Sequence, residues 1–151
     1  MMNLIAICKD AKNIGISGHI RPDGDCVGST CALRQFLKKA FPEKRIDIRL
    51  EQPADIYDFI PGVTEICRDA EDVIYDVFFV LDSISERIGD AYDYYEKAKY
   101  KVNIDHHVTN PGCGDIYYID AAASSASELV YDLIKEADPE LYNEMTQFGR
   151  R

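Results

Sequence analysis

The chain has 151 residues, of which 46% are hydrophobic and 29% are charged, and this composition is that of an ordinary globular domain. Its 27 acidic and 17 basic side chains give a formal net charge of −10. This charge argues against a protein that binds long duplex nucleic acid on a basic surface, so local positive charge must meet any anionic ligand. Apolar runs such as Val77–Leu81 are far shorter than the roughly 20 residues of a membrane-spanning helix, so we expect no membrane segment.

The cysteines and the N-terminus indicate the compartment. The five cysteines are scattered, and none belongs to a Cys-x-x-Cys pair. This pattern favours reduced thiols over a disulfide framework or a zinc knuckle. The N-terminus shows no basic leader followed by a long apolar stretch, so no secretion signal is expected. The prediction is a cytoplasmic protein, for which a homodimer stays open.

The first half of the chain alternates helical and extended patterns. Apolar side chains at helical spacing and short β-forming runs define these elements, and Gly18 and Pro42 interrupt them. The predicted elements are a helix over 4–11, a strand over 13–17, a loop over 19–25, a helix over 26–40, a strand over 45–50, one or two helical turns over 55–60 and a short strand over 63–67.

The second half continues the alternation. The apolar run that ends at Leu81 is typical of a central parallel strand buried on both faces. Ser125 and Glu128 have the spacing of a capping box that opens a helix. The predicted elements are strands over 76–81, 100–104 and 115–119, and helices over 85–97, 125–137 and from 138 onward. The fold class expected is therefore a three-layer α/β domain with a mainly parallel sheet of about five strands and helices on both faces.

Potential metal ligands follow three of the predicted strands. The ligands are His19, Asp23 and Asp25 after the first strand, Asp82 after the strand over 76–81, and Asp105, His106 and His107 after the strand over 100–104. The carboxyl ends of parallel strands share one edge of a sheet, and ligands bind at that edge. The three segments are therefore expected to converge on one cleft.

Carboxylates gathered in one cleft repel each other and raise each other's pKa unless cations lie between them. Aspartate oxygens and histidine nitrogens without thiolates favour Mn²⁺, with Mg²⁺, Fe²⁺ or Zn²⁺ less favoured, and the number of ligands suggests two ions. Two neighbouring ions are suited to activating a water for in-line attack on phosphorus. They would also explain how a chain of net charge −10 binds an anion.

Three segments resemble motifs I to III of the DHH phosphoesterase superfamily. They are Ser17-Gly18-His19-Ile20-Arg21-Pro22-Asp23-Gly24-Asp25-Cys26-Val27-Gly28-Ser29, the pair Leu81-Asp82 and the triplet Asp105-His106-His107. Asn110 and the segment 124–131 most resemble the NrnA-type branch. This resemblance implies an enzyme that uses Mn²⁺, degrades very short RNA oligomers and removes the 3′ phosphate from 3′-phosphoadenosine 5′-phosphate.

The resemblance also implies residue roles. His19 and Asp23 would bind one ion, Asp25 and His106 the other, and Asp82 would bridge both. His107 would face the phosphate as a catalytic and substrate-binding residue, and Asp105 would orient an imidazole. Arg21 and Ser29 are weaker candidates for substrate contacts, with a solvated loop arginine and tight packing of the Gly28-Ser29 helix start as the alternatives.

The sequence departs from the family pattern in two places. A fourth motif with a further aspartate and a smaller C-terminal domain would follow the helix that starts near Ser125, and neither occurs before Arg151. Residues 1–151 are therefore expected to be a catalytic domain that is truncated at its C-terminal end. Two alternatives stay open: the same site acting on a dinucleotide or pyrophosphate, and a catalytically incompetent domain that binds metal or a nucleotide or mediates assembly.

Overall fold

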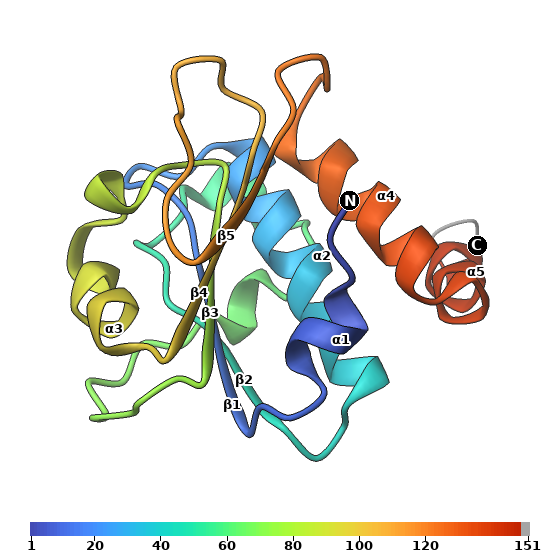
Figure 1. Cartoon of the computed structure of the whole chain (residues 1–151), viewed down its shortest axis with the longest axis horizontal. Coiled ribbons are helices and arrows are strands. Elements are labelled where there is room, and N and C mark those ends of the chain that lie inside the picture. Colours follow the sequence, from blue (N-terminus) through green and yellow to red (C-terminus); the bar gives the residue numbers. More distant parts are fainter. Residues whose placement is uncertain (149–151) are drawn as a thin grey trace.

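The computed structural model describes residues 1–148 and contains a five-stranded sheet in which every neighbouring pair is parallel (Figure 1). The strand order is β2-β1-β3-β4-β5. The strands are β1 (Asn13–Ser17), β2 (Arg45–Ile48), β3 (Val77–Leu81), β4 (Tyr100–Asp105) and β5 (Ile116–Ile119). The sequence prediction of a parallel α/β sheet of about five strands is confirmed.

Helices cover both faces of this sheet, which gives the expected three layers. Figure 1 shows α1, α2 and α4 on one face and α3 on the other, with α5 packed at the outer end of α4. The helices are α1 (Leu4–Cys8), α2 (Gly24–Ala40), α3 (Tyr92–Lys97), α4 (Ala126–Ala137) and α5 (Pro139–Phe148), with short 3₁₀ helices η1 (Asp55–Tyr57), η2 (Val63–Glu65), η3 (Ser85–Arg87) and η4 (Gly89–Ala91). Among the described residues, no helix is long and apolar enough to span a bilayer.

Strand β3 belongs to both cores because alternate side chains of a strand point to opposite faces. Phe79 and Leu81 pack into the core under α1, α2 and α4. Phe78 and Val80 pack into a second, smaller core with Tyr95 of α3. All five residues of β3 are buried, as its uninterrupted apolar sequence predicts.

Two predicted elements are wrong. The segment 63–67 contains the 3₁₀ helix η2 and no strand, because Gly62 has a left-handed φ of 93° and starts a turn in which Glu65 N donates to Gly62 O. The predicted helix over 85–97 is broken into η3, η4 and α3. The break lies at Gly89, whose φ of 65° is incompatible with a continuous right-handed helix.

The strand order places a topological switch point between β1 and β3. From β1 the chain moves to β2 on one side, whereas β3, β4 and β5 follow on the other side. In open parallel sheets the ligand crevice lies outside the carboxyl ends of the strands at such a point. His19 follows β1 and Asp82 follows β3, so the fold brings two predicted ligands to this crevice.

Candidate metal centre

His19 and Asp23 lie on one side of the crevice. The Nε2 atom of His19 is 3.3 Å from Oδ2 of Asp82 and 3.6 Å from Oδ1 of Asp23. Nδ1 of His19 donates a hydrogen bond of 2.8 Å to the carbonyl of Ile20, so Nε2 is the ring nitrogen that faces the carboxylates and would bind a metal ion once it is deprotonated. The contact with Asp82 raises the pKa of His19 to about 9, although burial opposes the rise.

Asp25 and His106 lie on the other side. Nε2 of His106 is 3.5 Å from Oδ2 of Asp25 and 3.4 Å from Oδ1 of Asp82. The carboxylate of Asp25 also accepts hydrogen bonds of 2.9 and 2.8 Å from the backbone N–H groups of Ala126 and Ser127, in the first turn of α4. Burial raises the pKa of Asp25, but the hydrogen bonds from Ser127 and Ala126 outweigh it and hold this pKa below its usual range.

Asp82 lies between the two sides, and its two oxygens face different imidazoles. The residue is 3% exposed and has a left-handed φ of 59°, which aspartate tolerates better than most residues. Burial raises its pKa, and the carboxylates of Asp25 and Asp23 add to the rise. Its Oδ1 atom is buried and has no hydrogen-bond partner among the described residues. Burying a carboxylate oxygen without a hydrogen-bond partner destabilises the folded chain, because the oxygen loses its contacts with water and gains none in return.

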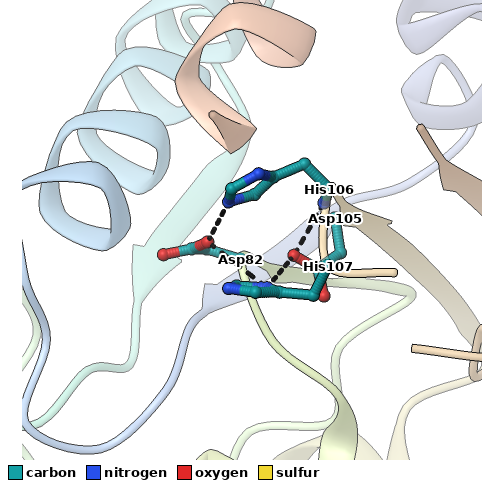
Figure 2. A group of neighbouring side chains, drawn as sticks. All are labelled: Asp82, Asp105, His106 and His107. Atoms are coloured by element: carbon teal, nitrogen blue, oxygen red, sulfur yellow. Dashed lines mark hydrogen bonds and ion pairs between the residues drawn. The ribbon is translucent and has the colours of Figure 1, made fainter. Parts of the chain in front are cut away.

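Asp105 and His107 form a hydrogen-bonded pair at the end of β4. Nδ1 of His107 donates to Oδ1 of Asp105 at 2.7 Å, and Asp105 is 1% exposed. Figure 2 shows both histidine rings extending from the end of β4 toward the carboxylate of Asp82. His107 is exposed, and its Nε2 is the ring nitrogen not used by Asp105. This arrangement fixes the tautomer of His107 and leaves Nε2 for a ligand.

Two buried asparagines hold the backbone of the site. Nδ2 of Asn103 donates to the carbonyls of Val80 and Ser83 at 2.9 and 2.8 Å, on either side of Asp82. Nδ2 of Asn110 donates to Oδ2 of Asp105 at 2.8 Å and to Oδ1 of Asn103 at 3.1 Å. These amides therefore connect the left-handed turn at Asp82 with the carboxylate that orients His107.

Two residues predicted to contact substrate, Ser29 and Arg21, do not join the cluster of carboxylates and imidazoles. Ser29 is fully buried in α2, and its hydroxyl donates to the carbonyl of Cys26 at 3.2 Å. The side chain of Arg21 is exposed and does not line the cavity beside the ligands, although its backbone N–H fixes the loop by donating to Glu51.

That cavity has a volume of about 280 Å³ and is lined by His19, Asp23, Asp82, Ser83, Ile84, Arg87, Asp105, His107, Thr109 and Asn110. Arg87 and Thr109 were not predicted as site residues, because a single exposed cation or hydroxyl gives no signal in one sequence. Cys26 was also missed, and its thiol lies within reach of the same atoms as His19 and Asp82. Burial and the carboxylate of Asp82 raise the pKa of this thiol, so Cys26 stays protonated and is a poor ligand.

The donor atoms fit divalent metal ions. Asp82 belongs to both groups of potential ligand atoms that the described residues form, one with His19 and one with His106 and His107. Two ligands bound to one ion at about 2.1 Å lie about 3.0–3.4 Å apart, and the imidazole–carboxylate separations in this structure are 3.3–3.6 Å. The unpartnered Oδ1 of Asp82 supports the same conclusion, because a cation would satisfy it.

Comparison with known proteins agrees with this geometry. Residues 13–148 match the sequence profile described as DHH family, N-terminal domain. The chain belongs to the DHH family. The matched range contains all the carboxylates and imidazoles described above, so they are part of the DHH domain.

Several relatives resemble this DHH domain. It is 34% identical over 118 residues to the bifunctional oligoribonuclease and PAP phosphatase NrnA of Bacillus subtilis (strain 168), which covers 78% of this chain and 36% of the relative. It is 31% identical over 124 residues to the protein of the same name from Thermus thermophilus, covering 80% of this chain and 36% of the relative.

A solved structure has the same fold. The crystal structure of an exopolyphosphatase-related protein from Bacteroides fragilis superposes with a TM-score of 0.76 and 28% sequence identity, covering 87% of this chain and 42% of that one. The DHH domain thus spans less than half the length of the relatives that it matches.

Proposed function

We propose that this DHH domain is the catalytic part of a divalent-metal-dependent phosphoesterase that acts on short RNA oligonucleotides and on 3′-phosphoadenosine 5′-phosphate. The observation that carries the proposal is the buried Asp82 carboxylate, whose two oxygens face His19 and His106 at 3.3 and 3.4 Å. The relatives named as oligoribonucleases and PAP phosphatases support the substrate class. The scattered cysteines make a cytoplasmic location part of the same proposal.

In this proposal two ions share the site. His19 and Asp23 would hold one, Asp25 and His106 would hold the other, and Asp82 would be shared by both. Mn²⁺ is the proposed metal, because mixed aspartate and histidine ligands suit it, and Mg²⁺ is the alternative. Such ions supply a water of lowered pKa and positive charge at the phosphate. Asp105 acts behind these ligands through its hydrogen bonds to His107 and Asn110.

His107 is the proposed catalytic residue of the chain itself. Its Nδ1–H is fixed on the buried carboxylate of Asp105, so Nε2 is presented to the cavity with a defined orientation. From that position Nε2 can donate a hydrogen bond to a phosphoryl oxygen or a proton to the leaving oxygen. Asp105 would hold the ring in this orientation, as an orienting carboxylate does in other acid–base pairs.

The test combines metal content, thermal stability and turnover. Mn²⁺ at about 100 times its Kd is expected to stabilise the chain by about 2.7 kcal/mol for each ion bound, and EDTA should reverse the effect. Turnover is measured on a diribonucleotide, 3′-phosphoadenosine 5′-phosphate and pyrophosphate, with Mn²⁺ or Mg²⁺. A melting temperature insensitive to both Mn²⁺ and EDTA would contradict the metal centre.

A second candidate is that the DHH domain, taken by itself, binds metal or a nucleotide without turnover, because it corresponds to only 36% of the length of the relatives from B. subtilis and T. thermophilus. The same assay separates the two candidates. Two bound Mn²⁺ ions with hydrolysis of either RNA-type substrate supports the phosphoesterase, whereas two ions with no turnover on the panel supports the binding domain. Preferential hydrolysis of pyrophosphate would replace the proposed substrate.

A further inference from the structure

Arg87 differs from most other arginines in the part of the chain that the structure describes. Four of the six described arginines have their guanidinium groups bound to carboxylates, a phenol or backbone carbonyls. These are Arg34, Arg45, Arg49 and Arg68. The side chains of Arg21 and Arg87 make no hydrogen bond or ion pair within residues 1–148, and of these two only Arg87 lines the cavity beside Asp82.

The backbone of Arg87 is rigid even though its side chain is exposed. Its carbonyl accepts a hydrogen bond of 2.8 Å from Ile20 N, in the loop that carries His19, and its N–H donates to Ile84 O. Gly89 has a left-handed φ of 65° and lies so close to Ile20 that a Cβ there would come within 2.8 Å of Ile20 Cγ2. The base of the Arg87 side chain therefore has a fixed position relative to the ligands on the His19 loop.

The charge of the cavity makes this cation significant. Three carboxylates line it, those of Asp23, Asp82 and Asp105, and Arg87 is the one arginine or lysine among its described lining residues. The chain has a net charge of −10, and the carboxylates of the cavity neutralise part of any positive charge bound there. A phosphate group that enters the cavity therefore needs a further positive charge. A guanidinium is suited to this task because its planar donors match two phosphate oxygens at once.

We propose that Arg87 binds a phosphate group of the substrate at the mouth of this cavity, beside His107. The identity of the substrate in this inference rests on the proposed function. The test does not, because it measures binding of phosphate and not turnover. His107 Nε2 and the Arg87 guanidinium then contact the same anion from two elements, the end of β4 and η3. Arg87 thereby takes the role that the sequence suggested for Arg21.

The test measures binding of inorganic phosphate and adenosine 5′-monophosphate to the Mn²⁺-loaded chain by calorimetry. R87Q should weaken both affinities about 10- to 100-fold, the size expected for loss of a hydrogen bond to a charged group. R87K should retain part of the affinity, and the Mn²⁺ stoichiometry of both variants should equal that of the wild type. Higher ionic strength should weaken binding more in the wild type than in R87Q.

Matched variants make the outcome decisive. K12Q removes one positive charge at the opposite edge of the sheet, before β1, and should bind phosphate like the wild type. The proposal is overturned if R87Q binds phosphate within twofold of K12Q, if R21Q shows the larger loss, or if R87Q also loses Mn²⁺. Absence of measurable phosphate binding by the wild type at millimolar concentration overturns it too.

Failure of the proposed function has a different signature. If the chain hydrolyses none of the panel but binds phosphate through Arg87, the role of Arg87 is supported and the phosphoesterase activity is contradicted. A chain that hydrolyses RNA while R87Q binds and turns over like the wild type keeps the phosphoesterase and loses this inference. In an active chain, R87Q should raise KM by the same factor as it weakens phosphate binding.

Discussion

Strand β3 is flanked by an aspartate at each end, and the two have opposite environments. Oδ2 of Asp76, before the strand, accepts backbone hydrogen bonds from Lys12 at 2.8 Å and Asn13 at 3.1 Å, and Oδ1 pairs with Lys99 at 3.2 Å. Asp82, after the strand, is buried, has a left-handed backbone and leaves Oδ1 without a hydrogen bond.

The pKa values of these two carboxyl groups follow the same division. Burial raises the pKa of Asp76, but the hydrogen bonds from Asn13 and Lys12 and the contact with Lys99 outweigh it, so this pKa is lowered. Burial raises the pKa of Asp82, and no described neighbour reverses the rise. At the amino edge of the sheet, the carboxylate of Asp76 finds its partners within the chain. At the carboxyl edge, the carboxylate of Asp82 lacks such partners among the described residues and is suited to bind a ligand.

The largest expected effect is at Asp82. Asn preserves size and tolerates a left-handed φ, so D82N removes the charge with little change of backbone. Affinity for Mn²⁺ should fall more than about 100-fold, because loss of even an outer partner of a metal ligand costs about 10- to 100-fold. The metal-free variant should melt at the same temperature as the wild type or higher, since like-charge repulsion is relieved. Calorimetric titration that finds two ions bound with near-normal affinity would exclude a bridging Asp82.

The next largest effects distinguish the roles of the adjacent residues His106 and His107. H107A should keep both Mn²⁺ ions and lose about 10²- to 10⁴-fold in turnover, the usual contribution of a general acid or base. H106A should lose metal at the second position, since Nε2 of His106 faces Asp25 and Asp82. Metal analysis beside single-turnover rates measures both effects. Equal loss of metal in the two variants would contradict the separate roles.

The smallest effect is at Asp76, where the same substitution serves as the control for D82N. D76N should lower the stability of the metal-free chain by about 1–2 kcal/mol, the difference between charged and neutral hydrogen bonds at two donors, and leave Mn²⁺ binding unchanged. Because the folded pKa of Asp76 is lowered, its stabilisation is present above the unfolded pKa of about 3.9 and is lost as the pH falls below it. Urea unfolding at pH 7 and pH 3 should therefore show a difference that shrinks at pH 3.

The strands were predictable because their signals are local. The predicted bounds of β1 coincide with those of the structure, and the apolar run of β3 identified a strand buried on both faces. The two failures lie at Gly62 and Gly89, whose left-handed backbone cannot be read from the residue type alone. The segment after Gly62 has β-forming residues, but of these only Cys67 bonds to the neighbouring β2, through its N–H to Ile48 O. At Gly89 the left-handed backbone breaks the expected helix, and the glycine also leaves room for Ile20, which a Cβ would approach to 2.8 Å.

The site residues that belong to sequence motifs could be predicted. Those whose role depends on contacts between distant segments could not. His19, Asp82 and the triplet at the end of β4 were candidates from the sequence, because their strand ends share one edge of a parallel sheet. Arg87 was missed because its importance depends on the 3₁₀ turn that aims it at that edge. Only half of the expected capping box at Ser125 is present: its hydroxyl accepts from Glu128 N, but the carboxylate of Glu128 accepts from Ser124 instead of from Ser125 N.

The contact between Asp25 and the first turn of α4 has a consequence for biosynthesis. It joins residues separated by 101 and 102 positions, so it is a long-range contact that can form only after both segments have been synthesised. During translation β1 and the His19 loop leave the ribosome long before α4 does. A nascent chain that ends before Ala126 therefore lacks both backbone donors of Asp25, and we expect high-affinity metal uptake only after α4 has emerged and docked.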